Sequence, residues 1–258
     1  MICHITFIEN CRRSLKFTFF AFFIAIVLTG SPQCLAREKT LLFTNGRNEL
    51  HGGSAVVNQT GQLDAYDGAQ ISAYDNSRVW AYDTCVVEAH GNSVIHANAH
   101  VKVKAMDNSH VFAVNKSEID AQGSATVYAQ DDVTVIAHGN VTLFANGDVK
   151  VKAYDDASII AWGNANVEVH GNAVVRSHDD SVITAFDGAT VKAYGESQVI
   201  AKDNCVVEAH EHSVITASKG VEVIRSDQAK VTYATEKMPD IKPDLKVDKL
   251  KEPISVGK

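Results

Sequence analysis

Histidine and aspartate are the residue types in this chain whose recurrence could support metal chemistry. Five of the 11 histidines share one position of a repeat, near turn aspartates such as Asp179; these are His90, His138, His170, His178 and His210. Zinc requires three or four ligands that converge at about 2.0–2.3 Å. The nearest pair in sequence, His170 and His178, would lie on opposite faces of a stacked repeat. We therefore expect strand-flanking packing, and we predict no metal site and no cofactor.

Cysteine chemistry is disfavoured for a similar reason. Three of the five cysteines fall within the first 36 residues, which leaves Cys85 and Cys205. These two share a repeat position and are fifteen eight-residue units apart. Regular stacking would separate them by about 20 Å or more, whereas disulfide-bonded Cα atoms lie roughly 4.4–6.8 Å apart. We expect two buried thiols and no disulfide bond.

The sequence contains no recognisable catalytic motif. Enzymes built on β-helices place their catalytic groups on long coils with loop insertions, but no repeat is interrupted here between Leu63 and Val231. The chain also has no run of Gly-Gly-x-Gly-x-Asp, the pattern of calcium-binding nonapeptides. We predict no catalytic residues and no enzymatic activity; a polysaccharide-acting β-helix enzyme remains an alternative.

An eight-residue period positions all of these side chains. From Leu63 to Val231, all 22 residues at eight-residue intervals are Leu, Ile or Val. Ala follows two residues later at 18 of the 20 sites between Ala65 and Ala217. With a small residue or Val two positions earlier, three alternate inward positions indicate a strand with one buried face. Asp or Gly then indicates a turn. Such short strands must stack coil upon coil, which predicts an all-β, parallel β-solenoid.

The outward position just before Ala indicates how many octads form one coil. Bulky and charged residues alternate there, so a coil of two octads, or 16 residues, gathers the bulky ones on one face: Trp80, His96, Phe112, Tyr128, Phe144 and Ile160. Thr126 and Thr142 fall beside them, whereas Lys104 falls on the opposite face. We favour this coil. The alternative is a triangular coil of three octads, or 24 residues, which would align Tyr66, His90, His138, Trp162, Phe186 and His210.

Composition divides the chain into four segments. The first combines basic residues, an apolar run of about 12 residues and the small residue Ala36, which is typical of a secretory signal; the run is shorter than the roughly 20 residues of a membrane-spanning helix. An uncleaved anchor is the alternative. The predicted segments are a signal peptide (1–36), an N-terminal cap or linker (37–60), the solenoid repeat domain (61–233) and a flexible, charged C-terminal tail (234–258).

The octads carry a resemblance. The segments Ser197-Gln-Val-Ile-Ala-Lys-Asp-Asn204 and Ser77-Arg-Val-Trp-Ala-Tyr-Asp-Thr84 resemble the alanine- and valine-rich octapeptide arrays of uncharacterised bacterial and phage proteins. The likeness covers about two thirds of the chain. It implies a β-solenoid and brings no catalytic residues with it.

Charge and surface pattern narrow the function. The formal net charge is −7, which argues against nucleic acid and anionic membranes as partners. Because the apolar run is short and belongs to the predicted signal, we expect no stable membrane insertion after signal cleavage. We expect a secreted, periplasmic or cell-surface module with a structural or adhesive role. Its aromatic face would bind a glycan, a surface polymer or another copy of the chain. Ice or crystal-surface binding is an alternative, although it requires a regular Thr lattice.

Overall fold

The computed structural model describes residues 40–226 and 228–234, and over these residues the chain is all-β. Its 25 strands alternate between two sheets. The odd-strand sheet contains β1 (Leu41–Phe43), β3 (Ser54–Val57), β5 (Gln70–Ala73), β7 (Val86–Ala89), β9 (Lys102–Ala105), β11 (Glu118–Ala121), β13 (Thr134–Ala137), β15 (Lys150–Ala153), β17 (Asn166–Val169), β19 (Val182–Ala185), β21 (Gln198–Ala201), β23 (Val214–Ala217) and β25 (Lys230–Tyr233). The even-strand sheet contains β2 (Arg47–His51), β4 (Gln62–Tyr66), β6 (Arg78–Ala81), β8 (Val94–Asn98), β10 (His110–Val114), β12 (Thr126–Gln130), β14 (Thr142–Asn146), β16 (Ser158–Trp162), β18 (Val174–Ser177), β20 (Thr190–Ala193), β22 (Val206–Ala209) and β24 (Glu222–Arg225).

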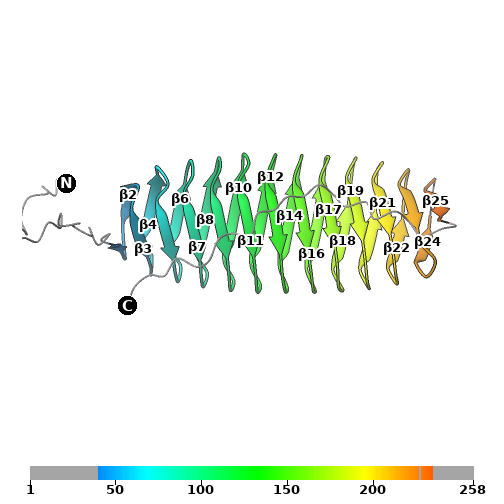
Figure 1. Cartoon of the computed structure of the whole chain (residues 1–258), viewed down its shortest axis with the longest axis horizontal. Helices are drawn as coiled ribbons and strands as arrows, with labels where there is room; N and C mark the ends of the chain where they lie inside the picture. The colour runs from blue at the N-terminus through cyan, green and yellow to red at the C-terminus, as the bar shows by residue number, and fades with distance from the viewer. Residues whose placement is uncertain (1–39, 227, 235–258) are drawn as a thin grey trace, which may run out of the picture. The chain divides into compact units, whose positions relative to one another are not determined.

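Both sheets are parallel, and their register confirms the predicted 16-residue coil. From β3 onward each strand pairs with the strand two octads further along the chain, as Ala55 does with Ile71 and Phe112 with Tyr128. The chain is therefore a parallel β-solenoid, whose coils stack along one axis (Figure 1). The 24-residue alternative is wrong, because it would align Trp162 with Phe186. Trp162 ends β16 in the even-strand sheet, whereas Phe186 directly follows β19 in the odd-strand sheet.

The core is a set of narrow columns between the sheets. Of the 22 aliphatic residues in the eight-residue period, all are buried except Val223 and Val231, which are partly buried. The Ala residues that follow them are buried as well. Fully burying one Val, Leu or Ile side chain contributes roughly 1.5–3 kcal/mol. The long series of coils therefore compensates for the small inward residues of each strand.

The turns explain why Asp and Gly recur. Asp75, Asp107 and Asp155 have positive φ, and each carboxylate accepts a hydrogen bond from a backbone N–H of the preceding coil, at 3.0–3.1 Å. Gly fills other positions of these turns because adjacent coils approach closely. A Cβ on Gly195 (φ +67°) would lie 2.8 Å from the backbone nitrogen of Asp179. The recurring Asp residues therefore stabilise the turns through hydrogen bonds between successive coils.

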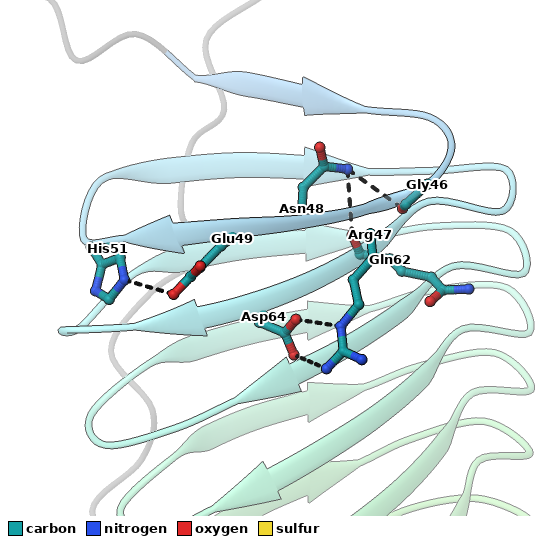
Figure 2. A network of polar contacts seen from close by, with 7 residues as sticks. All are labelled: Gly46, Arg47, Asn48, Glu49, His51, Gln62 and Asp64. Carbon is teal, nitrogen blue, oxygen red and sulfur yellow. Dashed lines mark hydrogen bonds and ion pairs between the residues drawn. The ribbon is translucent and has the colours of Figure 1, made fainter. Parts of the chain in front are cut away.

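The first coil is shorter than those that follow. Leu41 pairs with Ala55 and Arg47 pairs with Gln62, so both steps along the sequence are shorter than the step from Phe112 to Tyr128. Polar side chains of β2, the first strand of the even-strand sheet, contact one another and the neighbouring β4 (Figure 2). Arg47 donates to Asp64 at 2.6 and 2.9 Å, and the His51 ring contacts Glu49 at 3.0 Å and Asp67 at 2.8 Å. Charged groups on an edge strand discourage pairing with another chain.

The last described coil ends in a different way. The columns of Ala finish at Arg225, which lies beside Ala209, and at Tyr233, which lies beside Ala217. Both residues are exposed. Bulky side chains therefore stand here at positions where the earlier coils carry Ala.

The predicted segments can be placed only in part. Residues 41–57, within the predicted cap or linker, form β1, β2 and β3. The predicted signal peptide (1–36) lies outside the described residues, and so does the predicted tail from residue 235.

Candidate binding face

The predicted aromatic stripe lies on the even-strand sheet. The register places Trp80, His96, Phe112, Tyr128, Phe144 and Ile160 at equivalent outward positions of β6 to β16. Thr126 pairs with Thr142 in the neighbouring outward column. All eight predicted residues are therefore brought onto one face. These residues share one face because parallel strands about 4.8 Å apart place identical repeat positions side by side.

The rings of this stripe stack face to face. Successive centroids from Trp80 to Phe144 are 5.4, 5.0, 4.9 and 4.7 Å apart, with interplanar angles of 4–12°. These separations fall within the range of favourable offset stacking, which adds about 0.5–1.5 kcal/mol per pair. Each inner ring is consequently covered on both faces by its neighbours along the axis.

The stack is longer than the sequence indicated. Ile160 has no ring at the outward position that directly precedes Ala. Phe144 stacks instead on Trp162, which occupies the outward position directly after Ala, with the two ring centroids 6.4 Å apart. The stack then continues through His178 and Tyr194 to His210. Sequence reasoning missed this continuation and the guanidinium of Arg47, which lies 5.0 Å from the Trp80 ring centroid. Comparing both columns in the 16-residue register would have revealed the change of column.

The solvent-exposed part of the aromatic stripe consists mainly of ring edges. Phe112 is 39% exposed and Tyr128 is 40% exposed, and the other members are less so. Since the stacked neighbours cover the ring faces, a ligand on this sheet would meet ring edges, which carry partial positive charge.

Two polar columns flank the ring edges. We use the name strip for the outward residues of β8, β10, β12, β14 and β16: Val94, His96, Asn98, His110, Phe112, Val114, Thr126, Tyr128, Gln130, Thr142, Phe144, Asn146, Ser158, Ile160 and Trp162. The strip contains no Asp, Glu, Lys or Arg. The hydroxyls of Thr126, Thr142 and Ser158 form no hydrogen bond to any described residue, and the side-chain amides of Gln130 and Asn146 form none either.

The odd-strand sheet presents the opposite pattern over the same coils. Its outward positions on β9, β11, β15 and β17 carry seven charged residues: Lys102, Lys104, Glu118, Asp120, Lys150, Lys152 and Glu168. Several of them pair along the axis. Lys102 lies 2.8 Å from Glu118, and Lys152 lies 3.5 Å from Glu168. Four of the seven charged residues on this face therefore form ion pairs with one another, and β13 between them carries the uncharged Thr134 and Ile136.

Two titratable groups on the even-strand sheet, His96 within the aromatic stripe and Glu208 beyond it, have shifted pKa values. Burial lowers the pKa of His96, and the positive charge of Arg78 lowers it further. Beyond the stripe, Lys192 donates to Glu208 at 2.9 Å and holds the pKa of that carboxyl below its usual value. His96 is therefore neutral near pH 7, and the strip gains no charge from it.

The histidines considered as metal ligands are divided between the sheets. His90, His138 and His170 follow strands of the odd-strand sheet, whereas His178 and His210 follow strands of the even-strand sheet. They stack with aromatic neighbours, as His170 does with Phe186 at 4.6 Å. Within the part of the chain that the structure describes, no three His, Cys, Asp or Glu side chains are placed to hold a metal ion together.

Cys85 and Cys205 are both free and buried. Cys85 directly precedes β7 in the odd-strand sheet, and Cys205 directly precedes β22 in the even-strand sheet. Burial raises the pKa of the Cys85 thiol and raises that of Cys205 to about 11. Because the thiolate is the nucleophile, we expect both buried thiols to be poor nucleophiles at neutral pH.

Comparisons add no relative. No protein-family model, curated protein or solved structure matches this chain. None of the described residues belongs to a helix able to span a membrane.

Proposed function

We propose that this protein is a non-catalytic structural or adhesive module that acts outside the cytoplasm and binds its partner through the strip. One observation carries the proposal. The strip holds unpaired hydroxyl and amide groups beside exposed ring edges, whereas four of the seven charged groups on the odd-strand sheet pair with each other. Exposed apolar patches that are rimmed by polar residues mark interaction sites.

The regularity of the solenoid supports a binding role over catalysis. The coils from β4 to β25 keep the 16-residue register without a loop insertion, so no long loop stands over either sheet. A ligand on the strip would rest on rigid strands. The signal peptide predicted for residues 1–36 supports an extracytoplasmic location.

Ice or crystal-surface binding receives less support. That function requires Thr repeated regularly on one flat face. Thr126 and Thr142 are neighbours on the even-strand sheet, but Thr134 lies on the other sheet and the column continues to Ser158 and Val174.

The test places two positive charges on the strip. We expect Phe112→Lys with Tyr128→Lys to lower binding to surface polymers on a glycan array by at least about a hundredfold, because charged amines replace the exposed ring edges. The control variant, Ile136→Lys with Ile200→Lys, adds the same two charges to outward positions of the odd-strand sheet and should bind normally. Circular dichroism checks the folding of both variants, and light scattering reports the oligomeric state.

Retention of both polymer binding and oligomeric state by the strip variant would exclude the strip as the functional face. Equal loss in the control variant would have the same consequence, since it would show a general effect of charge.

A further inference from the structure

We infer that the occupant of the strip is an extended, uncharged polysaccharide chain that lies along the solenoid axis, across β8 to β16. The inference rests on the proposed function and specifies its ligand. It follows from the polar groups of the strip, from the distribution of charge around it and from its area.

The three columns of the strip match the amphipathic surface of a sugar chain. Thr126, Thr142 and Ser158 supply hydroxyls on one side, and Gln130 and Asn146 supply amides on the other. The ring edges of Phe112, Tyr128 and Phe144 run between these columns. A polysaccharide combines apolar C–H groups with hydroxyls that both donate and accept hydrogen bonds. Since the hydroxyls of the Thr and Ser residues and the amides of Gln130 and Asn146 have no partner among the described residues, they are free to bind such a chain, whereas Asn98 already accepts from Asn115.

The ring geometry sets the mode of contact. Sugars can stack on aromatic ring faces, but here adjacent rings cover those faces. The electropositive ring edges instead meet the oxygen atoms of the ligand. Binding should therefore depend on the flanking hydroxyls at least as much as on ring area.

The surrounding charges favour an uncharged ligand. The strip carries no Asp, Glu, Lys or Arg, and it ends at Arg78 on β6 and at Arg176 on β18. The turns beside the amide column carry exposed carboxylates, at Asp131, Asp132 and Asp148. A polyanion along the strip would lie beside these carboxylates and be repelled by them.

The area of the strip disfavours a second copy of the chain. Five strands spaced about 4.8 Å apart, with about five residues each, give a surface of about 24 by 16 Å, or about 400 Å². A stable protein interface buries about 800 Å² on each partner. The strip is thus too small for a dimer by itself, although its length suits a chain of several sugar units.

The experiment removes hydroxyls without changing shape. The full chain is tested by affinity electrophoresis against mixed-linkage β-glucan, mannan and chitin hexasaccharide as uncharged probes, and against polygalacturonate as an acidic one. We expect at least one uncharged probe to bind and added salt to have little effect. Thr126→Val with Thr142→Val should weaken that binding about tenfold, because each lost hydrogen bond is worth roughly 0.5–1.5 kcal/mol.

Thr134→Val with Thr216→Val is the matched control. It makes the same change at outward positions of the odd-strand sheet, and it should leave binding unchanged.

Three outcomes would overturn the inference. Salt-sensitive binding of polygalacturonate alone would indicate an acidic ligand held by Arg78 and Arg176, and binding of no uncharged probe would exclude the ligand class. A dimer that Phe112→Lys with Tyr128→Lys dissociates would identify a second copy as the occupant. The last result would leave the proposed function intact, because the strip would still be the binding face.

Discussion

Over the same five coils, the two sheets present opposite outward surfaces on nearly identical backbones. The odd-strand sheet carries Lys and carboxylate side chains that pair along the axis, such as Lys102 with Glu118. The even-strand sheet carries stacked rings beside Thr and Ser hydroxyls and the amides of Gln130 and Asn146, which no described residue binds. Inside, both sheets contribute the same aliphatic and Ala columns. The inward residues therefore define the scaffold, and only the outward residues distinguish a self-satisfied face from one that can bind.

The largest effect should come from the interior, where the two sheets are expected to behave alike. Ala137→Leu in the odd-strand sheet and Ala145→Leu in the even-strand sheet overfill equivalent, fully buried positions. We expect each to lower the free energy of unfolding by about 3 kcal/mol, because the narrow core cannot accommodate a larger side chain. Urea denaturation followed by circular dichroism measures this. A much smaller loss at one site would reveal a looser interior behind that sheet.

A smaller effect should separate the two outward faces. Lys152→Met removes the ammonium group that lies 3.5 Å from the carboxylate of Glu168, whose side chain is 11% exposed, and leaves that carboxylate with the His170 ring at 3.1 Å. We expect a loss of about 1–2 kcal/mol in the free energy of unfolding. Thr142→Val on the strip removes no intramolecular hydrogen bond, so it should change stability by less than about 0.5 kcal/mol. Equal losses would contradict the contrast between paired and unpaired faces.

The exposed pair of Lys102 and Glu118 serves as the control for this comparison. Their side chains are 40% and 41% exposed, and Lys102→Met should cost at most about 0.5 kcal/mol because solvent screens the pair.

The stability of the folded chain should depend on pH through His96, which lies on the even-strand sheet. The folded chain holds the pKa of His96 below its ordinary value of 6.5, so the unfolded chain takes up a proton first as the pH falls. The contribution of His96 to stability is therefore fully present above pH 6.5 and is lost as the pH falls toward its lowered folded pKa. His96→Phe should flatten this dependence in thermal melts across that range. An unchanged pH profile would indicate that His96 is not responsible.

The smallest difference between the two sheets is expected in the reactivity of their buried cysteines. With the pKa of Cys205 at about 11 and that of Cys85 also raised by burial, neither thiol should react with a maleimide in the native chain. Both should react in denaturant, as mass spectrometry would show. Selective labelling of Cys85 would mean that the odd-strand sheet opens more readily than the even-strand sheet.

Much of the scaffold could be predicted because its rules are local. The period of eight, the alternation of inward residues such as Val127 and Ala129, and turn residues such as Asp107 each depend on a few neighbouring residues. The 16-residue coil followed from one outward column, in which Trp80 and Phe112 fall on the same face. The continuation of the ring stack from Phe144 to Trp162 was missed, because it joins two repeat positions that the sequence pattern treats separately.

The sequence by itself determined the β-solenoid, its buried columns and the set of residues on each face, since these follow from strand alternation and from a regular period. Only the tertiary structure decided which side chains are satisfied and which are free. Partners such as Lys152 and Glu168 belong to successive coils and meet only because backbone hydrogen bonds bring those coils together. The same stacking covers the faces of the aromatic rings and turns their edges to solvent. An aromatic stripe in the sequence thus became, in three dimensions, a row of ring edges between unpaired hydroxyls and amides.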